Sequence, residues 1–122
     1  MWLEPGRYVV AEAGVLLARV TQTKQKGDRA YVGVDAGMHT LLRPALYGAW
    51  HEIVNLTKYG EAPTMTADVV GPICETGDTL GHARHLPDTR EGDLLLVATT
   101  GAYGRTMRSS YNRRQAPFEL LM

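Results

Sequence analysis

The only cysteine of this 122-residue chain lies in a stretch where a thiol could act as an acid. Cys74 is followed directly by Glu75, and the surrounding residues 71–78 begin with Gly-Pro and end in Asp78. Side chains with a chemical role concentrate in loops of this kind. Neighbouring negative charge favours the protonated thiol, which makes Cys74 a poor nucleophile and a candidate proton donor. An inert loop cysteine fits the same pattern equally well.

Arg43 and Tyr47 could form a binding site for a carboxylate. They are four residues apart, in a segment where Pro44 would occupy the first turn of a short helix, so both would lie on one helix face. A guanidinium group binds a carboxylate through two parallel hydrogen bonds, and the phenol would lie beside it. The alternative is an arginine at the start of a helix and a tyrosine in the core.

Two further stretches place glycine next to a polar side chain. Residues 4–7 read Glu-Pro-Gly-Arg and precede a predicted helix, so backbone N–H groups and Arg7 could face an anion. Tyr103 lies in Gly-Ala-Tyr-Gly at the end of an apolar run, where glycine lets a ligand approach the backbone closely. The alternatives are a turn with a surface arginine and a hairpin turn with an exposed tyrosine.

The four histidines do not indicate a metal site. His39, His51, His82 and His85 have no metal-ligand spacing relative to Cys74. In a strand over residues 80–86, His82 and His85 would point to opposite faces, because side chains alternate along a strand. We therefore predict no bound metal.

The elements that would position these residues are short, because thirteen glycines and six prolines divide the chain. The pattern predicts helical turns at residues 7–13 and 41–50. Predicted strands cover residues 15–23, 30–35, 63–70, 80–86, 93–99 and 118–121, with a polar turn at 26–28 joining the first two as a hairpin and 93–99 as a central strand. The predicted fold is mainly β, a β-barrel or sandwich with one or two short helices.

Composition limits the classes of protein to which the chain can belong. Thirteen Lys and Arg residues balance thirteen Asp and Glu residues, which disfavours nucleic-acid-binding and polybasic membrane-surface proteins. Hydrophobic residues make up 44% of the chain, as in ordinary globular domains. The apolar runs are far shorter than the roughly 20 residues that span a bilayer. A single cysteine fits a reducing compartment. We therefore expect one soluble, cytoplasmic domain.

The start of the chain is unusually apolar for a terminus, since Trp2 and Leu3 follow the first methionine. Chain ends are ordinarily exposed and poorly ordered. Two interpretations follow from this pattern. In one, the terminus docks as a strand, and in the other these residues continue from a segment upstream.

The stretches described above, taken in order, resemble one known family. They are Glu-Pro-Gly-Arg (4–7), Val-Asp-Ala-Gly (34–37), Arg-Pro-Ala-Leu-Tyr (43–47) with His51, Gly-Pro-Ile-Cys-Glu-Thr-Gly-Asp (71–78), Gly-Ala-Tyr-Gly (101–104), and Tyr111, Asn112 and Arg114. Together they closely resemble the diaminopimelate decarboxylase family over nearly the whole chain. The family depends on pyridoxal phosphate and converts meso-diaminopimelate to L-lysine and CO2.

The resemblance implies roles for individual residues. Cys74 would be the catalytic acid that protonates the α-carbon after CO2 leaves, and it would reach the partner's site in a homodimer. Glu75 would receive the distal ammonium group of the substrate. The substrate-binding residues implied are Arg7, Arg43, Tyr47, Glu75 and Tyr103. The cofactor-binding residues implied are Glu4, Pro5, Gly6, Arg7 and Tyr103.

The resemblance also implies that residues 1–122 form only the C-terminal β domain of the enzyme, like that of alanine racemase. The α/β barrel that binds pyridoxal phosphate, with its Schiff-base lysine, would be absent from this chain, so we expect the isolated domain to be inactive. Two alternatives are a non-catalytic β-barrel binding or interaction module, and a decarboxylase of another diamino acid such as ornithine or arginine.

Overall fold

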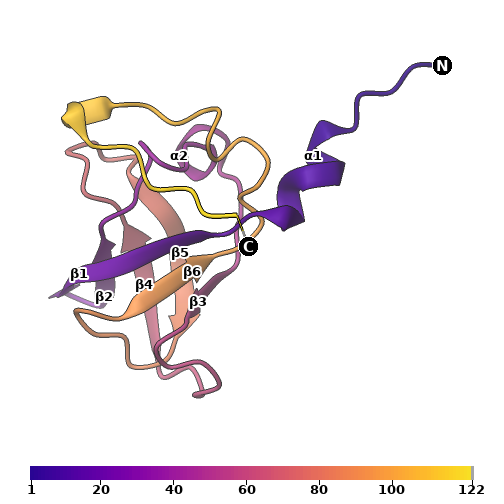
Figure 1. Ribbon diagram of the computed structural model, residues 1–122. Helices are drawn as coiled ribbons and strands as arrows, with labels where there is room; N and C mark the ends of the chain where they lie inside the picture. The colour runs from indigo at the N-terminus through magenta and orange to yellow at the C-terminus, as the bar shows by residue number, and fades with distance from the viewer. Residues whose placement is uncertain (122) are drawn as a thin grey trace.

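A six-stranded sheet forms the body of the protein in a computed structural model that describes residues 1–121. Its strands are β1 (Leu16–Lys26), β2 (Arg29–Val34), β3 (Ile53–Asn55), β4 (Met65–Val70), β5 (Thr79–Leu86) and β6 (Leu94–Val97). They lie in the order β3-β6-β1-β2-β4-β5, antiparallel except for β2 and β4 (Figure 1). The edge strands β3 and β5 contact each other, so the sheet curls into a nearly closed barrel. The predicted mainly-β barrel is confirmed.

The long strand β1 joins the two halves of this barrel. Its first half pairs with β6, from Leu16 opposite Val97, and its second half pairs with β2. The register shifts between Val20 and Gln22, and such a bulge bends a strand where it changes partner. Gly27 adopts φ 57° in the turn between β1 and β2, a left-handed conformation that glycine adopts without steric cost. The predicted hairpin is confirmed.

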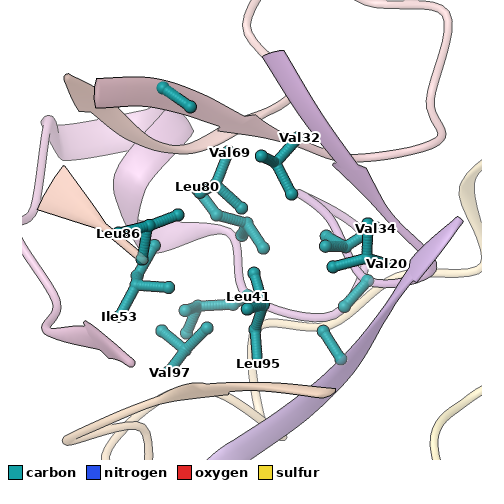
Figure 2. Packing of buried hydrophobic residues seen from close by; sticks show 13 residues of the cluster. Val20, Val32, Val34, Leu41, Ile53, Val69, Leu80, Leu86, Leu95 and Val97 are labelled. Atoms are coloured by element: carbon teal, nitrogen blue, oxygen red, sulfur yellow. The ribbon is translucent and has the colours of Figure 1, made fainter. Parts of the chain in front are cut away.

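The core lies inside the barrel because alternate apolar residues of each strand point inward. Full burial of one large aliphatic side chain contributes about 1.5–3 kcal/mol, so this cluster is the main source of stability. Leu41, from the connection after β2, lies among the strand residues (Figure 2). The cluster consists of Ala18, Val20, Val32, Val34, Ala36, Leu41, Ile53, Ala67, Val69, Leu80, Leu86, Leu95 and Val97.

Two short α-helices and two 3₁₀ turns complete the fold. They are α1 (Gly6–Val10), η1 (Ala11–Ala13), α2 (Arg43–Tyr47) and η2 (Tyr111–Arg113). Helix α1 buries none of its residues and stands apart from the barrel in Figure 1. In α2, Pro44 lies in the first turn, and Gly48 ends the helix in a left-handed conformation. Both predicted helical segments are confirmed. Within residues 1–121, no helix is long and apolar enough to cross a membrane.

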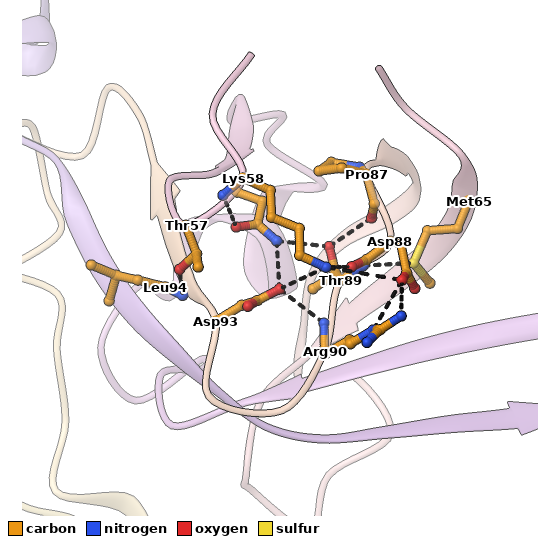
Figure 3. A network of polar contacts seen from close by, with 10 residues as sticks. Thr57, Lys58, Met65, Pro87, Asp88, Thr89, Arg90, Asp93 and Leu94 are labelled. Atoms are coloured by element: carbon orange, nitrogen blue, oxygen red, sulfur yellow. Dashed lines mark hydrogen bonds and ion pairs between the residues drawn. The ribbon is translucent and has the colours of Figure 1, made fainter. Parts of the chain in front are cut away.

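A buried polar network joins the end of β3 to the loop between β5 and β6 (Figure 3). The Asn55 amide donates hydrogen bonds to Thr89 Oγ1 (3.0 Å) and Asp93 Oδ2 (2.9 Å). Burial alone would raise the pKa of Asp93, but hydrogen bonds from Arg90 N–H and Asn55, together with the Lys58 charge, lower it below its ordinary value. The network fixes the loops without leaving these buried groups unpaired.

Several expectations about the strands are wrong. Residues 118–121 form no strand, since Phe118 is 98% exposed and has no strand beside it. The N-terminus does not dock as a strand either, because Trp2 is 100% exposed. The strand β3 was not predicted, because three residues between polar neighbours give too short a pattern.

A bulge in β5 changes the orientation expected for two histidines. Ala67 pairs with Arg84 and Val69 with Gly81, so β5 contains one more residue than β4 across this interval. His82 and His85 consequently approach Asp68 and Thr66, which lie on one face of β4. The prediction that these histidines point to opposite faces is therefore wrong.

Candidate functional site

The loop that carries Cys74 is held in place by a buried carboxylate. Asp78, which is 3% exposed, accepts hydrogen bonds from the backbone N–H groups of Met38 (2.5 Å) and Ile73 (2.6 Å). The bond from Met38 attaches residues 71–78 to the segment that follows β2, and the bond from Ile73 holds the loop itself together. Asp78 therefore has a structural function, and the exposed Cys74 rests on a fixed loop.

Two glycines leave room for this carboxylate. A Cβ atom at Gly37 or Gly71 would collide with the carboxylate oxygens of Asp78. The N–H group of Gly71 also donates to the backbone oxygen of Asp78 (2.9 Å), which closes the loop on itself. Close packing against Asp78 thus explains glycine at both positions.

The turn η2 lies against the Cys74 loop. The phenol of Tyr111 donates a hydrogen bond to Glu75 Oε1 (2.5 Å), and the amide of Asn112 donates one to Cys74 Sγ (3.4 Å). The hydrogen bond and the negative charge of Glu75 raise the pKa of Tyr111 above its ordinary value. This one turn therefore contacts both Cys74 and Glu75, the two side chains of the loop that are implied to act on substrate.

A second cluster contains three of the predicted substrate-binding residues. The guanidinium carbon of Arg43 lies 5.9 Å from the centre of the Tyr47 ring and 5.5 Å from that of Tyr103. Both distances are within the range of cation–π attraction. The helix α2 places Arg43 and Tyr47 on one face, as their spacing predicts. Within residues 1–121, Arg43 forms no ion pair and donates no hydrogen bond.

Tyr103 is held in place by a turn packed on η1. The N–H group of Gly101 donates to Ala11 O (3.0 Å), and a Cβ atom at Gly101 would overlap Val10 O. Tyr103 itself adopts φ 68°, an uncommon conformation for a non-glycine residue that costs about 1–3 kcal/mol. The packing of the turn therefore maintains the position of its side chain.

A hollow of about 520 Å³ lies between α1 and this turn. Four of the predicted cofactor-binding residues share it, namely Glu4, Pro5, Gly6 and Tyr103. The fifth, Arg7, has an exposed side chain and does not line the hollow. The hollow is large enough for a phosphate-bearing group, and Gly6 and Tyr103 lie on its wall.

The two clusters share no polar contact within one chain, although α2 and the Cys74 loop line a common hollow. Among the hydrogen bonds, ion pairs and cation–π contacts of residues 1–121, none joins Cys74 or Glu75 to Arg43 or Tyr103. Each cluster presents its groups outward. The arrangement therefore resembles two half-sites: one with an acid and a carboxylate, the other with a cation and two phenols.

Two histidines near these clusters are buried. His51 Nδ1 lies 2.9 Å from the backbone oxygen of Ala98. Burial lowers the pKa of His39 and outweighs the opposite effect of Asp78, while the backbone oxygen of His39 accepts a hydrogen bond from Ser109 N–H (2.9 Å). The part of the chain described here contains no group of three His, Cys, Asp or Glu side chains that could bind a metal.

Sequence reasoning gave no role to three residues of this region. In the sequence, Asp78 is only a negative charge near the thiol, and Tyr111 and Asn112 belong only to the family resemblance. Their contacts join segments 36 or more residues apart along the chain. Local spacing therefore carried no signal for them.

Residues 7–101 match the family described as "Pyridoxal-dependent decarboxylase, C-terminal sheet domain". The chain belongs to this family. A diaminopimelate decarboxylase of Methanothermobacter thermautotrophicus is 46% identical over 100% of the chain, which covers 28% of that protein. A diaminopimelate decarboxylase of Neisseria meningitidis is 50% identical over 98% of the chain, which covers 29% of that protein.

Solved structures of the family have the same fold. The diaminopimelate decarboxylase of M. jannaschii in complex with L-lysine matches with a TM-score of 0.88 and 40% identity over 94% of the chain, and the match covers 26% of that structure. The chain thus spans less than a third of the length of the curated relatives it matches. Membership in the family and the barrel fold are established, and the roles of single residues stay predictions.

Proposed function

We propose that this chain is the C-terminal domain of a diaminopimelate decarboxylase, which converts meso-2,6-diaminopimelate to L-lysine and CO2 in the last step of lysine biosynthesis. Relatives that carry this name are 43–50% identical over nearly the whole chain. The observation that carries the proposal is Arg43, a guanidinium positioned between two tyrosine rings without a carboxylate partner among residues 1–121. It suits the distal carboxylate, which ornithine and arginine lack.

The cofactor of the proposed enzyme is pyridoxal phosphate. When bound, it accepts the electron pair released as CO2 leaves. Glu4, Pro5, Gly6 and Tyr103 would hold its phosphate in the hollow beside α1, where they already lie together. Arg7, one position further along α1, would contribute positive charge to the phosphate and to the substrate.

The substrate meso-diaminopimelate has a distal centre with one carboxylate and one ammonium group. Arg43 would bind that carboxylate beside Tyr47 and Tyr103, and Glu75 would receive the ammonium group. The two opposite charges of the site therefore match the two charges of this centre. Such paired recognition favours diaminopimelate over a diamine with a bare ammonium group.

Cys74 is the proposed acid. Its S–H bond breaks as a C–H bond forms at the α-carbon, and the thiolate then recovers a proton from water. A positioned general acid accelerates such a step by about 10²–10⁴-fold. The exposed thiol on a fixed loop is suited to this task.

The complete enzyme is proposed to be a cytoplasmic homodimer in which Cys74 and Glu75 of one copy serve the site of the other. Cys74 and Glu75 are exposed and share no polar contact with Arg43 or Tyr103 within residues 1–121, which supports this arrangement. An N-terminal α/β barrel would supply the Schiff-base lysine, and the 28% coverage of the relatives leaves room for it. The exposed apolar side chains of Trp2, Tyr8 and Val9 would then be covered by that barrel. We expect the isolated chain to be inactive.

The test is a substrate series with the full-length enzyme. We expect meso-diaminopimelate to be decarboxylated in preference to ornithine and arginine, and Cys74→Ala to lower kcat by about 10²-fold or more. Arg43→Lys should raise KM for diaminopimelate selectively, because lysine lacks the planar fork that binds a carboxylate. A preference for ornithine would favour the other diamino-acid decarboxylases. Inactivity on all three substrates would favour a non-catalytic binding module.

A further inference from the structure

We infer that the turn η2 positions the acid loop, with Asn112 orienting the thiol of Cys74 and Tyr111 orienting the carboxylate of Glu75. The inference rests on the proposed function, in which these two side chains act on the substrate. It adds two positioning residues that act through Cys74 and Glu75.

The turn and the loop touch at three points. Asn112 Nδ2 donates to Cys74 Sγ (3.4 Å), and Tyr111 OH donates to Glu75 Oε1 (2.5 Å). A third hydrogen bond runs from the guanidinium of Arg114, the residue that follows η2, to the backbone oxygen of Pro72 (3.4 Å). The three contacts run along residues 72–75 on one side and 111–114 on the other, so the two segments lie side by side.

These bonds act on side chains that otherwise have freedom to rotate. An exposed cysteine samples three χ1 rotamers, and an exposed glutamate samples more because it has three torsions. The donor of Asn112 selects the rotamer in which Sγ lies toward η2, and the phenol of Tyr111 does the same for Glu75. Orientation of this kind contributes to catalysis because reacting groups must be held close to their productive geometry.

The turn and the loop are both attached to residues 37–40. The loop is attached to residues 37–40 by the hydrogen bond from Met38 N–H to Asp78, and the chain leading to η2 is attached to the same segment by the bond from Ser109 N–H to His39 O. His39 is buried, so this segment is part of the packed interior. Attachment to one packed segment fixes the turn relative to the loop.

The backbone of η2 is itself unusual. Asn112 and Arg113 adopt φ 54° and 55°, two successive left-handed residues in a single turn. Asparagine tolerates this conformation better than most residues, whereas arginine does so at a cost. The conformation places the amide of Asn112 over the thiol.

The two contacts predict different kinetic effects. Loss of the donor to Cys74 should slow proton transfer to the α-carbon and lower kcat, with little effect on KM. Loss of the donor to Glu75 should weaken binding of the distal ammonium group and raise KM, with little effect on kcat. A turn that served only to stabilise the fold would not divide the kinetic constants in this way.

The experiment uses the full-length enzyme with meso-diaminopimelate. Asn112→Asp and Asn112→Gly both tolerate the left-handed backbone, and each removes the donor. We expect kcat to fall about tenfold, the loss expected from one hydrogen bond, and the solvent deuterium isotope effect on kcat to increase. Tyr111→Phe should raise KM about tenfold while kcat stays within about twofold. Arg113→Asn is the matched control, because it alters the same turn without a contact to the loop.

The outcomes separate this inference from the proposed function. Unchanged kcat and isotope effect in both Asn112 variants would overturn the positioning role, provided that Cys74→Ala is impaired, and would leave the proposed function intact. An equal loss in Arg113→Asn would also overturn it, since the turn would then be only structural. Full activity of Cys74→Ala would overturn both, because the thiol would have no role to be positioned for.

Discussion

Asp78 accepts two short hydrogen bonds with one buried carboxylate, and the loop of Cys74 depends on both. Each bond comes from a backbone N–H group, one at Met38 and one at Ile73. An asparagine in this position would present one oxygen and one NH₂ group, so one N–H would face another donor. A buried donor without an acceptor costs roughly 1–3 kcal/mol.

We therefore predict that Asp78→Asn lowers the free energy of unfolding by about 2 kcal/mol. In the full-length enzyme the same variant should also lower kcat, because the loop that carries the acid is no longer fixed. Urea unfolding and steady-state assays measure the two effects. Asp28→Asn, in the exposed β1–β2 turn, is the control and should change neither quantity. Equal stability of the two variants would contradict the role assigned to Asp78.

The burial of His39 makes the stability of the chain depend on pH. Its pKa in the folded state lies below the ordinary value of 6.5, so the unfolded chain binds more protons at lower pH. Stability is therefore complete above about pH 6.5 and decreases as the pH falls from there to the folded pKa. Asp68 and Asp93 also have lowered pKa values, but their contribution is lost only below their ordinary value of 3.8.

The window from about pH 7.5 to about pH 5 thus isolates the histidine. We predict that the free energy of unfolding of the chain declines across this window, with a slope of at most about 1.4 kcal/mol per pH unit from one proton. The slope should be smaller in His39→Gln. Urea titrations at several pH values provide the measurement, and identical slopes in the two proteins would show that His39 is not the group responsible.

At the scale of the elements, the pattern of apolar residues along the sequence predicts the secondary structure wherever a strand or helix is regular. The sequence pattern predicts β1, β2 and β4, and Pro44 predicts the first turn of α2, whereas the predicted segment 41–50 extends past the end of that helix at Tyr47. It fails for β3, whose three residues form a strand only because β6 lies beside them. It also fails at residues 118–121, where an apolar composition is present but no neighbouring strand is available.

The candidate site divides in the same way. Arg43 and Tyr47 are one helical turn apart, so their proximity follows from the sequence, whereas the contact between Cys74 and Asn112 joins residues 38 apart and depends on the folded barrel. The bulge in β5 could not be predicted either, because an inserted residue is defined only relative to the partner strand. Spacing along the chain thus predicts the neighbours within one segment, and tertiary packing brings residues of distant segments to them.

The packing of the Tyr103 turn on η1 yields a prediction at this scale. In Gly101→Ala the added methyl group would overlap Val10 O, so the turn must move away from η1 and take Tyr103 with it. We expect a loss of stability of about 1–3 kcal/mol and weaker binding of pyridoxal phosphate to the full-length enzyme. Thermal unfolding and a spectroscopic titration with the cofactor measure these effects. Gly77→Ala is the control, since its Cβ meets no atom within 4 Å, and an equal effect there would refute the explanation.

At the scale of the whole molecule, the proposed half-sites would determine how many chains one reaction requires. Arg43, Tyr47 and Tyr103 form one cluster, and Cys74 and Glu75 form another that shares no polar contact with it within residues 1–121. Closed homodimers are two-fold symmetric, so each copy can complete its partner's site with the half that it does not use itself. If the site is shared in this way, two inactive variants with defects in different half-sites should regain activity when they form a mixed dimer.

We predict such complementation between full-length Cys74→Ala and full-length Arg43→Met. Each homodimer lacks one half of both sites and should be nearly inactive. When subunits are exchanged at equal concentrations, half of the dimers contain one copy of each variant. In these dimers both defects fall in one site and the other site is intact, so activity should reach about a quarter of wild type. A mixture of Cys74→Ala with Glu75→Gln is the control, because both changes lie in the same half-site, so each site of a mixed dimer keeps one defect and no activity should be restored. Mixtures of Cys74→Ala and Arg43→Met that stay inactive after proven subunit exchange would place the acid and the cation in the site of a single chain.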